Sequence, residues 1–151
     1  MNIHAQTAHR LNELIAMARD GQHFYSEAAS KVDDAQLSAL FTRIAEVKQE
    51  IVRDLSAVVT SAGGEPATHG TIVGAMQEVY GKVRGALGDK RYGYVAELEE
   101  SEDRLLKAFT EAASDQDVPA TAREAVTRLL PEVRECHNVM RARKQAMKNV
   151  A

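Results

Sequence analysis

A glutamate interrupts an otherwise apolar pattern between residues 95 and 112. Apolar side chains recur there at alternating spacings of three and four, which is typical of a helix that buries one face. Glu102 occupies the position that would complete the pattern. A carboxylate in a protein core needs a cation, a metal ion or hydrogen-bond donors to compensate its charge. The sequence therefore predicts that Glu102 has a buried partner.

Cationic and imidazole side chains interrupt two other apolar patterns. Lys48 lies within the longest three-and-four pattern of the chain, which covers residues 37–62. His137 faces inward from the last amphipathic segment, and Arg134 lies one helical turn before it on the same face. Each of these groups could neutralise a carboxylate or donate a hydrogen bond to it.

Residue counts from the predicted turns place these side chains in one layer. The first turn lies at residues 33–34 and the last lies near residue 117. Lys48 follows the first turn by about fifteen residues, and Glu102 precedes the last by about fifteen. We expect the hydroxyl group of Tyr25, a couple of helical turns away, to reach the same layer. The predicted core polar layer consists of Tyr25, Lys48, Glu102, Arg134 and His137.

Four long amphipathic helices must position this layer, and their periodicity predicts an all-α bundle. The predicted helices cover residues 7–32, 35–62, 94–114 and 119–148. Short turns make the first two helices antiparallel, and likewise the last two.

The connection between the second and third helices is long. It covers residues 65–93 and contains a shorter amphipathic helix at about residues 72–87. Such a connection can return along the bundle, which favours an up-down-down-up arrangement with parallel second and third helices. An up-down-up-down bundle with a bulky loop is the alternative.

Four segments carry a resemblance to a known group of proteins. They read FYSEAASKV, ALFTRIAEVKQEIVRDL, GYVAELEESEDRLLKAF and LLPEVRECHNVMR. The chain resembles the ferritin-like superfamily, and most of all bacterial four-helix-bundle proteins of unknown function related to rubrerythrins. The resemblance covers nearly the whole chain and implies a ferritin-like bundle. It also suggests a role in a stress response.

The resemblance implies a di-iron ligand set, from which this sequence departs. Members with iron use one Glu from each of helices one and three and a Glu-x-x-His pair from each of helices two and four. Glu102 and His137 keep two of these six positions. The other four are occupied by Ala18, Lys48, Ile51 and Arg134. A depleted di-iron site is therefore what the resemblance implies.

Because four of the six ligand positions are lost, we expect a cationic side chain to take the place of the metal. A divalent cation would be repelled by Lys48 and Arg134, so we expect no metal cofactor. If any ion binds, Glu102 and His137 would hold it. We expect Lys48 to neutralise Glu102, with Arg134 or His137 completing the hydrogen bonds. The alternative for Lys48 is that its ammonium group extends to the surface.

Composition limits the remaining classes of function. The 151 residues fit one domain, and the formal charge of −3 gives no electrostatic case for nucleic-acid binding. Cys136 is the only cysteine, so no internal disulfide forms. The chain shows neither a secretory signal nor an apolar run long enough for a membrane span. We therefore expect a soluble cytoplasmic protein.

These observations favour a non-enzymatic bundle that binds a protein partner or assembles with itself, most simply as a dimer. Two alternatives stay open. The first is a metal-binding protein or di-iron-type oxidoreductase with the depleted ligand set. The second is a small-ligand binder that uses the core polar layer.

Overall fold

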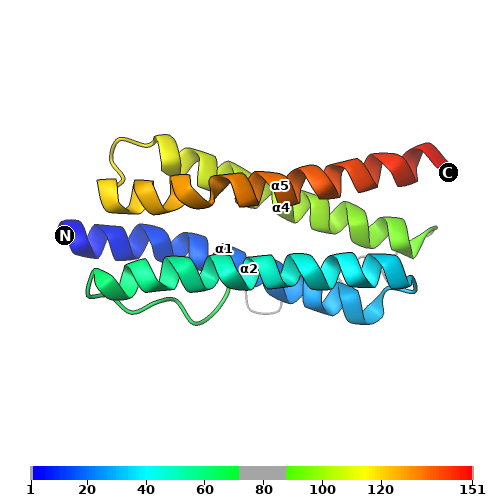
Figure 1. The fold of residues 1–151 in the computed structure, drawn as a ribbon, viewed down its shortest axis with the longest axis horizontal. Coiled ribbons are helices and arrows are strands. Elements are labelled where there is room, and N and C mark those ends of the chain that lie inside the picture. The colour runs from blue at the N-terminus through cyan, green and yellow to red at the C-terminus, as the bar shows by residue number, and fades with distance from the viewer. Residues whose placement is uncertain (1, 72–87, 151) are drawn as a thin grey trace.

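Four long helices lie side by side in the computed structural model, which describes residues 2–71 and 88–150 (Figure 1). They are α1 (Ile3–Lys31), α2 (Ala35–Ser61), α4 (Lys90–Ser114) and α5 (Ala120–Val150). The described residues contain no strand, so the predicted all-α class is confirmed. The short helix predicted at residues 72–87 falls outside the described residues.

Polar caps extend two helices beyond the predicted starts. The side chain of Asn2 accepts a hydrogen bond from the backbone N–H of Ala5, and α1 begins at Ile3 instead of residue 7. Asp89 caps α4 in the same way, and this helix begins at Lys90 instead of residue 94. A capping oxygen satisfies an N–H group that the first helical turn leaves free. The apolar periodicity missed these turns because they lie mostly at the surface.

A hydrogen-bonded segment after α2 leads the chain back along α1. Asn12 donates a hydrogen bond to the carbonyl oxygen of Glu65, and Arg19, about two turns further along α1, donates one to the carbonyl oxygen of Ala67. The segment thus runs in the direction of α1, towards the end of the bundle where α2 begins.

The starts of α2 and α4 lie at the same end of the bundle. Arg91, in the first turn of α4, donates a hydrogen bond of 2.7 Å to the carbonyl oxygen of Asp33, just before α2. Figure 1 shows α2 and α4 running in one direction and α1 and α5 in the other.

The core consists of two hydrophobic clusters stacked along the bundle. One cluster contains Leu11, Leu55 and Phe109, and the other contains Phe41 and Met140. On α2 and α4, residues of both clusters flank the positions of the core polar layer. The polar layer is therefore enclosed by apolar side chains on both sides along the helix axes.

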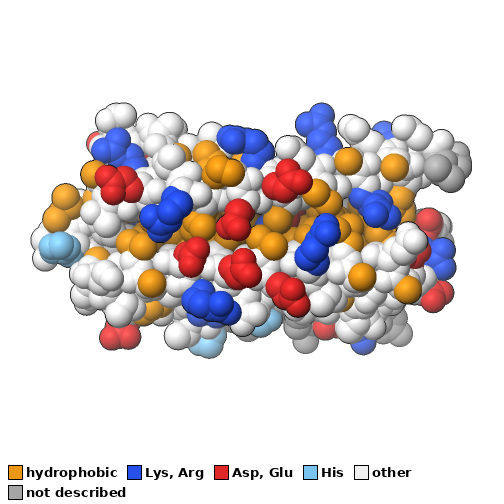
Figure 2. Space-filling view, in the orientation of Figure 1, with side chains coloured by type: hydrophobic (Ala, Val, Ile, Leu, Met, Phe, Trp, Pro, Cys, Tyr) orange, Lys and Arg blue, Asp and Glu red, His pale blue; other side chains and the backbone are white. Residues whose placement is uncertain are grey.

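The face formed by α2 and α5 is mixed in charge. Figure 2 shows acidic and basic side chains interspersed over the face formed by α2 and α5, with hydrophobic side chains visible between the two helices. Among the described residues, Ile3 is the one exposed large hydrophobic side chain, at 59%. None of the helices in this part of the chain has a stretch long and apolar enough to cross a membrane.

Candidate functional site

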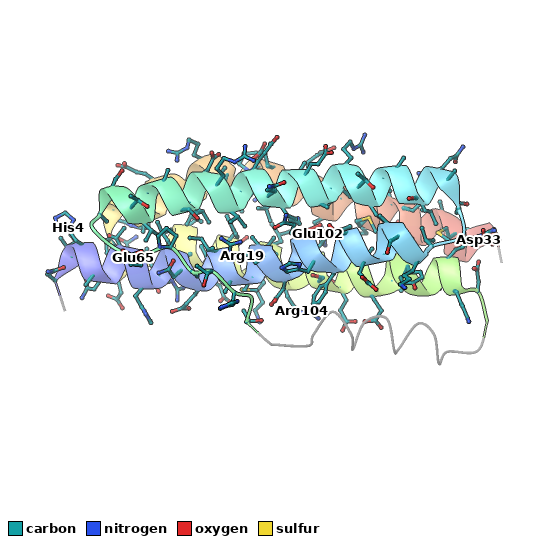
Figure 3. All side chains as sticks on the ribbon, turned by 90° about the horizontal axis from the view of Figure 1, so that it is seen from below. His4, Arg19, Asp33, Glu65, Glu102 and Arg104 are labelled. Carbon is teal, nitrogen blue, oxygen red and sulfur yellow. The ribbon has the colours of Figure 1, made fainter. Side chains whose placement is uncertain are left out.

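A buried ion pair joins α2 to α4 in the middle of the bundle. The Nζ atom of Lys48 lies 2.5 Å from Oε1 of Glu102, and both side chains are 1% exposed. Figure 3 shows Glu102 inside the bundle, whereas Arg104, two positions later on α4, lies on the outside. The ammonium group therefore compensates the carboxylate charge within the core and does not reach the surface.

Tyr25 of α1 completes the hydrogen bonding of this carboxylate. Its hydroxyl group donates a hydrogen bond of 2.7 Å to Oε2 of Glu102. Burial, reinforced by the negative charge of Glu102, raises the pKa of Tyr25 well above its usual value, so the hydroxyl stays protonated as a donor. Nζ of Lys48 also lies 5.9 Å from the centre of the Tyr25 ring, within the range of a cation–π contact. Each oxygen of Glu102 thus has its own donor.

The aliphatic part of Lys48 crosses the core against α1. A Cβ atom built on Gly21 would lie 3.5 Å from Cε of Lys48 and 3.6 Å from its Cδ and Cγ. Gly21 is buried and therefore packs against the lysine chain. These are ordinary van der Waals distances, so the position has room for a methyl group.

Cys136 of α5 lies near the ion pair as a buried free thiol. Burial raises its pKa from 9.0 to about 11, although the nearby charge of Lys48 acts in the opposite direction. The thiolate is the nucleophilic form of cysteine, and it is scarce at neutral pH when the pKa is this high. Cys136 is therefore a packing residue here.

Arg134 does not join the core polar layer, and that part of the prediction was wrong. Its side chain is exposed. The buried face of α5 runs through Val133, Cys136 and Met140. Successive helical residues are about 100° apart, so Arg134 points away from the direction of Val133. His137 lies at the edge of this face, and a residue one turn earlier falls beyond that edge.

His137 is buried but contacts a different carboxylate from the expected one. Its Nε2 atom forms a hydrogen bond with Oδ1 of Asp103 on α4, while its Nδ1 atom is buried without a partner in the described structure. Glu99, one turn before Asp103, accepts a hydrogen bond of 3.4 Å from Lys144. We call Glu99, Asp103 and His137 the shoulder cluster, because they lie at the side of the buried α4–α5 contact.

Sequence reasoning missed Glu99 and Asp103 because they lie beside the apolar stripe of α4 and not within it. Glu99 is 8% exposed, whereas the side chain of Asp103 is 54% exposed. Their spacing of four residues places both on one face of the helix. Two carboxylates four residues apart on one helix, together with an inward-facing histidine on the helix that packs against it, are the sequence signal that could have identified the cluster.

The core polar layer does not fit the di-iron ligand set that the resemblance implies. Ala18 and Ile51 are fully buried apolar residues and offer no ligand atom. Glu102 remains, but its two oxygens are bonded to Lys48 and Tyr25. A dication placed there would lie against an ammonium group and have a single carboxylate to hold it.

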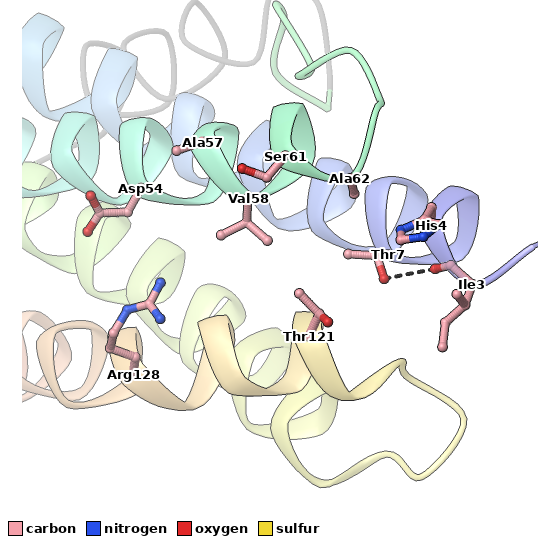
Figure 4. A pocket seen from close by; sticks show the side chains of 10 residues that line it. All are labelled: Ile3, His4, Thr7, Asp54, Ala57, Val58, Ser61, Ala62, Thr121 and Arg128. Atoms are coloured by element: carbon pink, nitrogen blue, oxygen red, sulfur yellow. Dashed lines mark hydrogen bonds between the residues drawn. The ribbon is translucent and has the colours of Figure 1, made fainter.

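A groove opens at the end of the bundle where α1 begins, α2 ends and α5 begins (Figure 4). We call it the end groove, and its volume is about 510 Å³. Ile3 and Val58 contribute apolar surface, while Asp54 of α2 and Arg128 of α5 are charged residues on its two sides. The full lining consists of Ile3, His4, Thr7, Asp54, Ala57, Val58, Ser61, Ala62, Thr121 and Arg128.

Comparison with known proteins gives a family but no function. No curated protein matches the chain. The family model of a domain of unknown function, DUF2383, matches residues 6–115. This range includes Tyr25, Lys48 and Glu102 but ends before α5. Because the match covers more than half of the sequence, the chain belongs to the DUF2383 family of domains of unknown function.

Proposed function

We propose that this protein is a ferritin-like bundle without enzymatic activity in its core, in which an ion pair replaces a metal centre and which acts by assembling with a second copy of itself. The buried pair between Lys48 and Glu102 carries the proposal. The directions of the four helices and the long connection after α2 support the ferritin-like assignment.

The closed state of the core argues against catalysis there. Tyr25, Lys48 and Glu102 are each at most 1% exposed, so a dissolved substrate does not reach them. A catalytic acid or base must come within hydrogen-bond reach of the substrate proton. The groups in this layer instead satisfy one another, which is the arrangement of a structural polar network.

The end groove supports self-assembly because its charges are self-complementary. A two-fold axis running along the groove would bring α2 of one copy opposite α5 of the other. Asp54 of each copy then faces Arg128 of its mate, and apolar surface around Ile3 becomes buried. Such an interface needs no further chain, which makes a second copy the simplest occupant.

Charge reversal tests this assembly through analytical ultracentrifugation. The unaltered protein is expected to sediment as a dimer. Asp54→Arg and Arg128→Glu should each give monomers, because each places like charges opposite one another twice in the dimer. Mixing the two variants should restore a dimer, because every contact then joins opposite charges. A monomeric unaltered protein, or a mixture that stays monomeric, contradicts the assembly.

Elemental analysis tests the core separately. Protein purified in the presence of iron and manganese should retain no metal that depends on Glu102. Stoichiometric iron or manganese that persists in Asp103→Asn but disappears in Glu102→Gln would overturn the proposed replacement. The free, buried Cys136 also fits the reducing cytoplasm in which we place the protein.

A further inference from the structure

The shoulder cluster has the composition of a metal site outside the core. Its three residues offer one imidazole nitrogen and two carboxylate oxygens, which all lie within 4.8 Å of one another. Glu99 and Asp103 come from adjacent turns of α4, and His137 faces them from α5. Two separate helices therefore converge on one point, with ligand types that zinc commonly uses.

Burial distinguishes this cluster from acidic residues scattered on a surface. Glu99 and His137 are each 8% exposed, so the packing of the bundle holds them in place. Asp103 is exposed, so its side chain can turn away from its direct contact with His137 and let both groups bind one ion at zinc–ligand distances of about 2.0–2.2 Å. The Nε2 atom of His137 contacts Asp103 directly, so this ring nitrogen faces the carboxylates of the cluster.

The local charge also favours a cation. Two carboxylates face one imidazole, and the ammonium group of Lys144 contacts Glu99 at a long 3.4 Å. The side chain of Lys144 is partly exposed and can move into solvent when another cation arrives. Lys144 thus acts as a competitor for the site and not as a permanent part of it.

We propose that Glu99, Asp103 and His137 bind one divalent zinc ion, with Lys144 lowering the affinity by competing for Glu99. The ion would link α4 to α5 at the side of the bundle and leave coordination positions open to water. This site is independent of Glu102, whose oxygens serve Lys48 and Tyr25. It therefore goes beyond the proposed function and does not depend on it.

Calorimetric titration of the metal-stripped full chain with zinc chloride tests the proposal. We expect one ion per chain, with affinity reduced at least about tenfold in both Asp103→Asn and His137→Gln. Asp103 is exposed, so its variant keeps the fold even if the His137 variant is destabilised. Lys144→Met should bind zinc more tightly than the unaltered protein, a change that a merely structural lysine would not produce.

His9→Gln provides the matched control. His9 and Glu13 form an exposed histidine–carboxylate pair on α1, with Nε2 of His9 3.2 Å from Oε1 of Glu13. The control variant should bind zinc as the unaltered protein does. Absence of zinc binding, binding that is unchanged in Asp103→Asn, or an equal loss in His9→Gln would each overturn the proposal.

Discussion

Removing Lys48 and Glu102 together should destabilise the protein less than removing either one alone. Lys48→Met leaves the carboxylate of Glu102 buried with only the Tyr25 hydroxyl as donor. Glu102→Leu leaves a buried ammonium group without its counter-charge and the Tyr25 hydroxyl without its acceptor. Breaking a buried pair from one side costs about 3–5 kcal/mol, so each variant should lose about that much stability.

The double variant removes both charges and retains one defect. The Tyr25 hydroxyl still lacks an acceptor, which costs about 1–3 kcal/mol in a buried site. Adding Tyr25→Phe removes that group as well, so the triple variant should be at least as stable as the double. The two single losses sum to about 6–10 kcal/mol, well above the loss expected for the double variant. The resulting coupling energy of several kcal/mol is large enough to measure.

Urea unfolding followed by far-ultraviolet circular dichroism is the suitable assay, because the chain is helical and contains no tryptophan. The exposed pair of Arg104 and Glu100, with 4.0 Å between Nη1 and Oε1, gives the matched control. The cycle of Arg104→Met and Glu100→Gln should give a coupling below about 0.5 kcal/mol. If the losses for Lys48→Met and Glu102→Leu simply add in the double variant, the reasoning about the buried pair is refuted.

Three further predictions concern residues around the layer. Gly21→Ala should raise the free energy of unfolding by about 0.5–1 kcal/mol, because alanine favours the helix and its methyl group would lie at an ordinary van der Waals distance from Lys48. A lower melting temperature for this variant would contradict the packing. Between about pH 9 and 11 the raised pKa of Cys136 should by itself cost about 2–3 kcal/mol of stability, because folded Cys136 retains a proton that the unfolded chain releases near pH 9. Urea titrations should therefore show a shallower decline in Cys136→Ala. Arg134→Met should change stability by less than about 0.5 kcal/mol in thermal melts, since this exposed side chain stands outside the layer.

The Lys48–Glu102 contact could be predicted because both residues interrupt strong apolar patterns. A helical pattern with a single polar interruption specifies the direction in which that side chain points. The number of residues from the nearest turn specifies its position along the helix axis. Both quantities depend only on helix geometry, which varies little. The prediction therefore required no knowledge of side-chain packing.

Arg134 and Asp103 show where this approach fails. Both lie close to the edge of a buried face, where a rotation of one residue, about 100°, decides between core and solvent. A periodic pattern does not determine the helix rotation to that precision. The partner of His137 depends on this rotation, so the sequence pointed to Glu102 whereas the structure has Asp103.

The exchange of a metal for an ammonium group would change where this bundle can act. A bound metal can keep an open coordination position. A metal centre in the middle of the bundle could therefore bind a substrate inside the core. An ammonium group paired with Glu102 and packed against Tyr25 offers no such position, and here it is sealed by hydrophobic clusters on both sides. Because the core is closed, the contacts that we propose with other molecules and ions lie outside the core polar layer. The end groove and the shoulder cluster both lie away from Glu102, and both include residues of α5, which lies beyond the part of the chain matched by the family. Substitutions at Arg128 or His137 of α5 would therefore alter the proposed assembly or the proposed metal binding without changing Lys48 or Glu102.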